Sequence, residues 1–131
     1  MRTILLIDDD AISNFLSKSM IEKSGIFDKV FVYSSATAAL EFLFGCAEKE
    51  IEFPEIILLD VMMPVMDGFT FLEEFKRLDP SKSGHVKVCM LTSSLDPKDR
   101  QQADAYPQVV EFISKPINQE KIKKFMTHID N

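Results

Sequence analysis

The chain has 131 residues, of which 46% are hydrophobic and 27% charged, and its formal net charge is -6. These values are typical of one globular domain and exclude a disordered chain. The negative charge disfavours nucleic acid and anionic membrane surfaces as partners, and no apolar run approaches the roughly 18 residues of a membrane span. No secretory signal precedes the first apolar run, so we expect a cytoplasmic protein whose Cys46 and Cys89 are buried free thiols.

Five short apolar runs predict five β-strands, and the one that ends at Asp60 has four consecutive large apolar residues. So continuous a run suits a strand that is buried on both faces, as in the middle of a parallel sheet. The predicted strands cover residues 3–7, 29–33, 56–59, 86–91 and 109–113.

A helical segment is predicted after each strand, so that five helices alternate with five strands. The first has apolar residues at helical spacing, with Asp10 as its N-cap or first-turn acid and Gly25 at its C-terminal cap. The others start near Ser35, Asp67, Asp96 and Asn118, and the polar segment 97–105 is the weakest of them. Residues 79–84 have the composition of a plain loop. This alternation predicts an α/β fold, a doubly wound parallel sheet with helices on both faces.

Functional side chains follow four of the five predicted strands. Asp8 and Asp9 follow the first, Asp60 the third, Thr92 the fourth and Lys115 the fifth. The second strand is followed only by serines, which places it at an edge of the sheet. Because the carboxyl ends of parallel strands form the ligand crevice of such folds, we expect these five side chains to converge.

Three carboxylates in one crevice favour a hard divalent cation, and Mg²⁺ suits such a site because it also accepts water and phosphate oxygens. An aspartate can attack phosphorus and form an aspartyl-phosphate, with a lysine and a hydroxyl holding the phosphoryl oxygens. Each residue alone has an ordinary explanation, such as a helix cap for Asp67 or simple exposure for His85 and His128. The combination is what indicates phosphoryl chemistry.

The chain resembles the receiver domains of two-component response regulators, in particular the stand-alone, chemotaxis-like ones, from about Thr3 to Ile129. The most specific match is D-x-x-M-P-x-M-D-G, from Asp60 to Gly68. The runs that support it are Leu6–Asp10, Met90–Ser93 and Phe112–Pro116. The resemblance, and not the residue pattern, implies the strand order 2-1-3-4-5 of flavodoxin-like folds.

The resemblance also implies roles for individual residues. Asp60 corresponds to the phosphoacceptor, and Mg²⁺ would be held by Asp8, Asp9, Asp60 and the backbone carbonyl of Met62. Thr92 and Lys115 correspond to the hydroxyl and the ammonium that contact the phosphoryl group. Further correspondences are a switch pair of Thr92 and Phe112, a cis peptide bond at Lys115-Pro116, and positions that tune the phosphoryl lifetime at Met62 and Ser94.

The implied function is a phosphorylation-dependent signalling switch formed by residues 1–131 as a single receiver domain. Its partners would be a sensor histidine kinase or a histidine phosphotransfer protein, and a downstream protein target. It would act as a monomer, or as a dimer on activation, and its output face would be residues 97–105, 109–113 and 118–129. No effector domain follows the last helix in this sequence, and this is the basis for expecting a stand-alone receiver.

Two alternatives remain. An aspartate-nucleophile phosphohydrolase would carry a second aspartate two residues after the nucleophile, where this chain has Met62, and would need residues for a cap domain. A degenerate receiver that only binds partners would not need the intact set of Asp8, Asp9, Asp60, Thr92 and Lys115.

Overall fold

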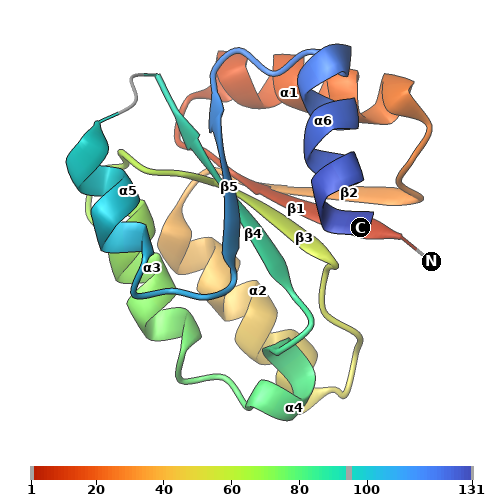
Figure 1. The fold of residues 1–131 in the computed structure, drawn as a ribbon. Coiled ribbons are helices and arrows are strands. Elements are labelled where there is room, and N and C mark those ends of the chain that lie inside the picture. Colours follow the sequence, from red (N-terminus) through yellow and green to blue (C-terminus); the bar gives the residue numbers. More distant parts are fainter. Residues whose placement is uncertain (1, 94–95, 131) are drawn as a thin grey trace.

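A computed structural model describes residues 2–93 and 96–130, and in it five parallel strands form one sheet in the order β2-β1-β3-β4-β5 (Figure 1). This confirms the predicted fold class and strand order, with β2 at one edge and β5 at the other. The strands are β1 (Thr3–Ile7), β2 (Lys29–Tyr33), β3 (Ile56–Asp60), β4 (Lys87–Thr92) and β5 (Val109–Ser114). All five residues of β3 are buried, as its continuous apolar run predicts.

Six helices lie in the described part of the chain, one more than expected. They are α1 (Ala11–Ser24), α2 (Ala36–Glu48), α3 (Gly68–Phe75), α4 (Pro80–Ser83), α5 (Pro97–Ala103) and α6 (Gln119–Asp130). The additional helix, α4, corrects the expectation of a plain loop over residues 79–84. Asp79 caps it by accepting a hydrogen bond from the Ser81 N–H, and Pro80 occupies its first turn.

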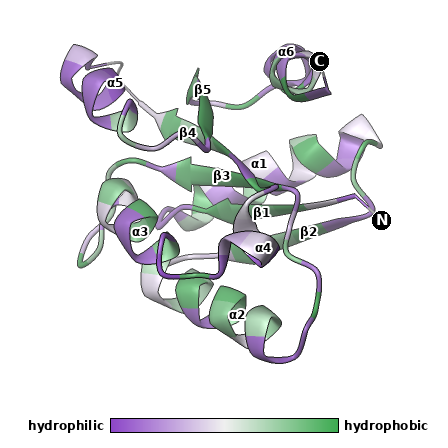
Figure 2. Cartoon of the chain, turned by 60° about the horizontal axis from the view of Figure 1, so that its bottom comes forward, coloured by the Kyte–Doolittle hydropathy of each residue, from purple (hydrophilic) through white to green (hydrophobic). Residues whose placement is uncertain are grey.

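The helices cover both faces of the sheet, as Figure 1 shows, and two hydrophobic clusters result. One face packs against α2 and α3, together with Ala103 of α5. The opposite face packs against α1 and α6 through Ile21, Ile122, Phe125 and Met126. Figure 2 shows this division, with largely hydrophobic strands between helices of mixed hydropathy and a mostly hydrophilic α5. Both cysteines are buried and free.

Helix α1 is unusual in the side chains that it exposes. Its caps are as predicted, because Asp10 accepts hydrogen bonds from the first turn and Gly25 adopts φ 69°. Its apolar residues Ile12, Phe15 and Leu16 are nevertheless 73%, 74% and 52% exposed. The buried residues of α1 are Asn14, Ser17 and Ile21. The apolar spacing therefore identifies a helix correctly but does not mark its core-facing side.

Register brings the strand-end residues together. Ile7 of β1 pairs with Leu59 of β3, so the next residues along the two strands are Asp8 and Asp60. Alternation along the strands places both on the side of Leu6 and Leu58, which is the side covered by α1 and α6. The acids therefore lie beside the start of α1.

Across the described residues, no helix is both long and apolar enough to cross a membrane.

Candidate functional site

The predicted acids converge at the carboxyl end of the sheet. Carboxylate oxygens of Asp8, Asp9 and Asp60 lie within 4.8 Å of one another. The Lys115 ammonium joins two of them, at 2.7 Å from Asp8 Oδ2 and 3.1 Å from Asp60 Oδ2. Asp8 and Asp60 are buried, whereas Asp9 is exposed. Four of the predicted site residues therefore form one cluster that opens to solvent through Asp9.

Asp60 is buried by its place at the end of the central strand. Its Oδ1 accepts a hydrogen bond from the Met62 N–H at 3.2 Å, and its Oδ2 contacts Lys115. Burial and, to a lesser extent, the nearby Asp8 carboxylate together raise the pKa of Asp60 to about 6, although Lys115 opposes both. A raised pKa means that the charged carboxylate is destabilised by its surroundings. A bound cation can relieve this destabilisation of the Asp60 carboxylate, and so can the formation of a covalent bond to one of its oxygens.

Asp8 and Lys115 show the opposite balance between burial and partners. Burial alone would raise the pKa of Asp8, but hydrogen bonds from Lys115, Asp10 and Ser13 outweigh it and lower that pKa. Burial alone would lower the pKa of Lys115, but its contacts with both aspartates outweigh it and raise that pKa. Asp8 and Lys115 are therefore both charged at neutral pH. Asp60 is the member of the cluster whose charged form is destabilised.

The donor set fits Mg²⁺. It consists of carboxylate oxygens, which are the ligands that this hard cation prefers. Asp9 makes no hydrogen bond or ion pair with any residue of the described chain, so its carboxylate is available as a ligand. A ligand role for the Met62 carbonyl stays a prediction. The Met62 side chain itself is 75% exposed.

Thr92 and Phe112 lie on the neighbouring strands β4 and β5, toward their carboxyl ends. Thr92 ends β4 and is 6% exposed, and its carbonyl accepts a hydrogen bond from the Lys115 N–H at 2.9 Å. The half-buried Phe112 ring packs against the α2 and α3 side of the sheet, with the Arg100 guanidinium 5.3 Å from its centroid. The Lys115-Pro116 bond is cis, as expected. Ser94, the second expected tuning position, lies outside the described residues.

The sequence did not predict the contacts that three residues make in the site, namely Gly68, Ser13 and Asn14. A Cβ on Gly68 would lie 2.7 Å from the Asp60 carbonyl oxygen, so only glycine allows α3 to start this close to β3. The Ser13 hydroxyl donates to Asp8 Oδ2 at 2.8 Å, and the Asn14 amide donates to the Asp8 carbonyl at 2.7 Å. Their only signal in the sequence is that polar residues interrupt the apolar stripe of α1.

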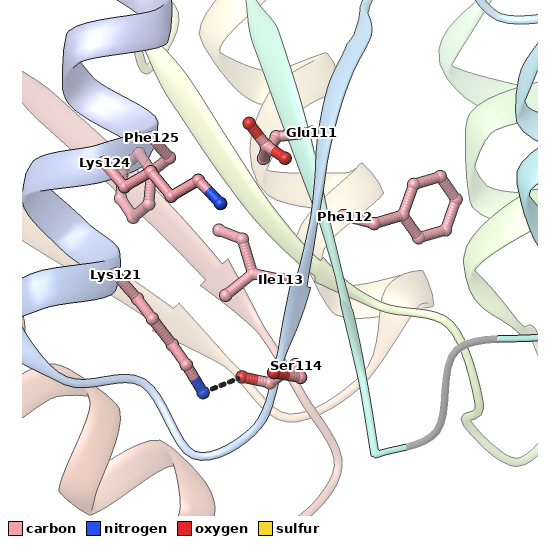
Figure 3. A pocket seen from close by; sticks show the side chains of 7 residues that line it. All are labelled: Glu111, Phe112, Ile113, Ser114, Lys121, Lys124 and Phe125. Atoms are coloured by element: carbon pink, nitrogen blue, oxygen red, sulfur yellow. Dashed lines mark hydrogen bonds between the residues drawn. The ribbon is translucent and has the colours of Figure 1, made fainter.

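Two surface hollows lie beside these elements. One, of about 310 Å³, lies between α1 and the segment after β5, and Ile12, Leu16, Lys115 and Pro116 are among its lining residues. It adjoins the exposed apolar residues of α1. The other, of about 110 Å³, lies between β5 and α6, where Lys121 bonds the Ser114 carbonyl at 2.8 Å. Figure 3 shows Glu111 and Ile113 pointing toward α6 and Phe112 pointing away from it.

Comparison with known proteins agrees with this architecture. Residues 4–127 match the family model of the response regulator receiver domain. The chain is 32% identical to the protein-glutamate methylesterase/protein-glutamine glutaminase 3 of Burkholderia thailandensis, over 88% of this chain and 29% of that protein. It is 34% identical to the response regulator PleD of Caulobacter vibrioides, over 66% of this chain and 18% of that protein.

The chain therefore spans less than a third of the length of these two curated relatives. Among solved structures, a two-component response regulator from Cytophaga hutchinsonii is 30% identical, with a TM-score of 0.89. That match covers 100% of this chain and 98% of the other, so the similarity extends over the whole fold.

Proposed function

Because this chain belongs to the response regulator receiver domain family, we propose that it is a phosphorylation-dependent switch whose phosphoacceptor is Asp60. The observation that carries the proposal is the position of Asp60, which is 5% exposed at the end of the central strand and shares the Lys115 ammonium with Asp8. The donor would be a sensor histidine kinase or a histidine phosphotransfer protein. Residues 1–131 would act as one receiver domain in the cytoplasm, as a monomer or as a dimer on activation.

The proposed step is a displacement at phosphorus. An Asp60 carboxylate oxygen attacks the phosphorus atom of a phosphohistidine, an oxygen–phosphorus bond forms, and the nitrogen–phosphorus bond breaks to release the imidazole. Mg²⁺, held by Asp8, Asp9, Asp60 and the Met62 carbonyl, would neutralise charge on the phosphoryl oxygens. Lys115, which already contacts Asp60, would pair with one of those oxygens, and the Thr92 hydroxyl would donate to another.

The exposed apolar face of α1 supports docking of a protein donor beside the acids. Ile12, Phe15 and Leu16 form this α1 patch, and the adjoining hollow is lined by Lys115 of the acid cluster. Contiguous exposed apolar side chains commonly mark protein interfaces. A donor helix on this patch would lie beside the acid cluster that contains Asp60.

The signal would leave through α5, β5 and α6, the elements that correspond to the output face expected from the sequence. Phosphorylation would draw Thr92 toward the phosphoryl group, and the Phe112 ring beside β4 would move into the vacated space. Arg100 of α5 covers that ring, so its movement would change the surface of α5 as well. Such a two-state element needs only a small difference in free energy to shift.

The alternatives have less support. A phosphohydrolase would use a second aspartate two residues after Asp60, and Met62 supplies no acid or base there. The enzyme names of some relatives describe those proteins, which are much longer than the region that this chain matches. A receiver that only binds partners would not need a buried, destabilised Asp60 paired with Lys115. We therefore propose that the chain turns over no external substrate.

The test is treatment with acetyl phosphate and Mg²⁺, followed by intact-mass and peptide mass spectrometry. We expect one phosphoryl group on Asp60, no adduct when EDTA replaces Mg²⁺, and none on Asp60→Asn. Asp67→Asn is the matched control, because Asp67 caps α3 by accepting a hydrogen bond from the Thr70 N–H and asparagine caps equally well. A full adduct on Asp60→Asn would show that another residue is the acceptor.

A further inference from the structure

The first turn of α1 contacts Asp8 at three points. The Asp10 N–H donates to Asp8 Oδ1 at 3.0 Å, and the Ser13 hydroxyl donates to Asp8 Oδ2 at 2.8 Å. The Asn14 amide donates to the Asp8 backbone carbonyl at 2.7 Å. One helical turn thus fixes both carboxylate oxygens and the main chain of a residue that is fully buried.

Asn14 is held in this place at a cost. Its side chain is 7% exposed, and its Oδ1 is a buried polar atom for which the described structure offers no hydrogen-bond partner. A buried acceptor without a partner destabilises the fold, and an apolar residue of similar size would avoid that. What the asparagine supplies is the amide N–H that bonds the Asp8 carbonyl, which indicates a role in placing Asp8.

Ser13 has a related but distinct position. Its hydroxyl shares Asp8 Oδ2 with the Lys115 ammonium, which is 2.7 Å from the same oxygen. The proposed phosphoryl group would draw Lys115 away from the acids. Asp8 Oδ2 would then lose one of its two donors, and Ser13 is the donor that remains. Asp9, by contrast, makes no hydrogen bond or ion pair with the described residues and can adapt freely.

We propose that Ser13 and Asn14 are positioning residues, which hold Asp8 in the orientation that Mg²⁺ binding and phosphoryl transfer require. This inference rests on the proposed function of the acid cluster. It also links the two sides of α1, because Ser13 lies between Ile12 and the rest of the exposed α1 patch along the helix. A donor that docks on that patch would thus lie against the same turn that orients Asp8.

The experiment compares Ser13→Ala, Ser13→Thr and wild type by calorimetric titration with Mg²⁺ and by the rate of phosphorylation from acetyl phosphate. Loss of a residue that orients a metal ligand typically weakens metal binding by about tenfold or more. We expect this loss in Ser13→Ala and near wild-type affinity and rate in Ser13→Thr, which keeps the hydroxyl. Asn14→Ala should also bind Mg²⁺ more weakly, although it removes the unpaired Oδ1.

Ser17→Ala is the matched control, since Ser17 is buried one turn further along α1 and has no hydrogen bond to the acids within the described chain. Wild-type affinity and rate in Ser13→Ala would overturn the positioning role and leave the proposed function intact. An equal loss in Ser17→Ala would also overturn it, because the effect would then belong to the helix in general. Failure of wild type to bind Mg²⁺ or to become phosphorylated would overturn both proposals.

Discussion

Helices α1 and α6 cover the same face of the sheet but distribute their side chains in opposite ways. In α6, Ile122, Phe125 and Met126 are buried in the core, and Lys123 and Lys124 are exposed. In α1, Asn14 and Ser17 are buried, while the α1 patch of Ile12, Phe15 and Leu16 faces solvent. The difference teaches that α6 mainly completes the hydrophobic core, whereas α1 turns polar side chains toward the acid cluster and leaves an apolar patch exposed.

The largest effect is expected when one aromatic ring is removed from each helix. Phe125 is 1% exposed, so Phe125→Ala should lower the free energy of unfolding by about 3–5 kcal/mol. Phe15 is 74% exposed, so Phe15→Ala should change it by no more than about 0.5 kcal/mol. Urea unfolding at equilibrium measures both changes. Similar losses in the two variants would contradict the contrast between the helices.

The second test concerns the electrostatic destabilisation of the fold by the acid cluster, which lies beneath α1. The fold raises the pKa of Asp60 from 3.8 to about 6, so between these values the folded state binds more protons than the unfolded state. The free energy of unfolding of the wild type should therefore fall as pH rises through this window. At about 1.4 kcal/mol for each pKa unit, the cost above pH 6 is at most about 3 kcal/mol.

Asp60→Asn removes that cost. Without metal, Asp60→Asn should have a higher melting temperature than wild type. The matching gain in the free energy of unfolding should be small near pH 4 and should reach roughly 1–3 kcal/mol above pH 6. Addition of Mg²⁺ should close much of the gap, because the cation relieves the same repulsion in the wild type. Thermal unfolding at several pH values measures this, with Asp67→Asn as the control. A gap that ignores both pH and Mg²⁺ would count against a clustered acidic site.

The smallest expected effect concerns the outer face of α1. Phe15→Ala should slow phosphotransfer from a phosphohistidine donor protein by about tenfold, the loss that an interface aromatic commonly causes. Its phosphorylation by acetyl phosphate should not change, because a small donor needs no docking surface. Ile51→Ala is the control, since Ile51 is also exposed, at 54%, but precedes β3 at the opposite end of the sheet.

A stopped-flow or quenched-flow time course separates these outcomes. Equal slowing with the protein donor and with acetyl phosphate would mean that Phe15 affects the chemistry and not the docking. Equal slowing by Ile51→Ala would mean that the patch on α1 is not the docking surface.

The sequence predicts the fold and the acid cluster well because both depend on local signals. Five apolar runs give the strands, and parallel pairing brings Asp8, Asp60 and Lys115 to one end of the sheet. The start signals of α4, Asp79 and Pro80, were also present, but four helical residues are too short a run to show periodicity.

The orientation of α1 and the packing at Gly68 could not be predicted in the same way. Spacing identifies a helix, but which side faces inward depends on what lies beneath it, and here Asp8 accepts hydrogen bonds from Ser13 and Asn14. Gly68 reads as a turn residue, and its close approach to the Asp60 carbonyl appears only when β3 and α3 are placed together. Both features depend on tertiary contacts rather than on local propensity.

The most direct test of the switch is a map of amide chemical shifts and hydrogen exchange before and after addition of Mg²⁺ and beryllofluoride, a stand-in for the phosphoryl group. We expect changes at Asp8–Asp10 and Asp60–Asp67 and also across residues 92–117, with the latter weakened in Thr92→Ala. This result would show that the acid cluster and the output face are coupled. Changes confined to the acids, with residues 92–117 unaffected, would contradict the account, because the site would then bind without switching.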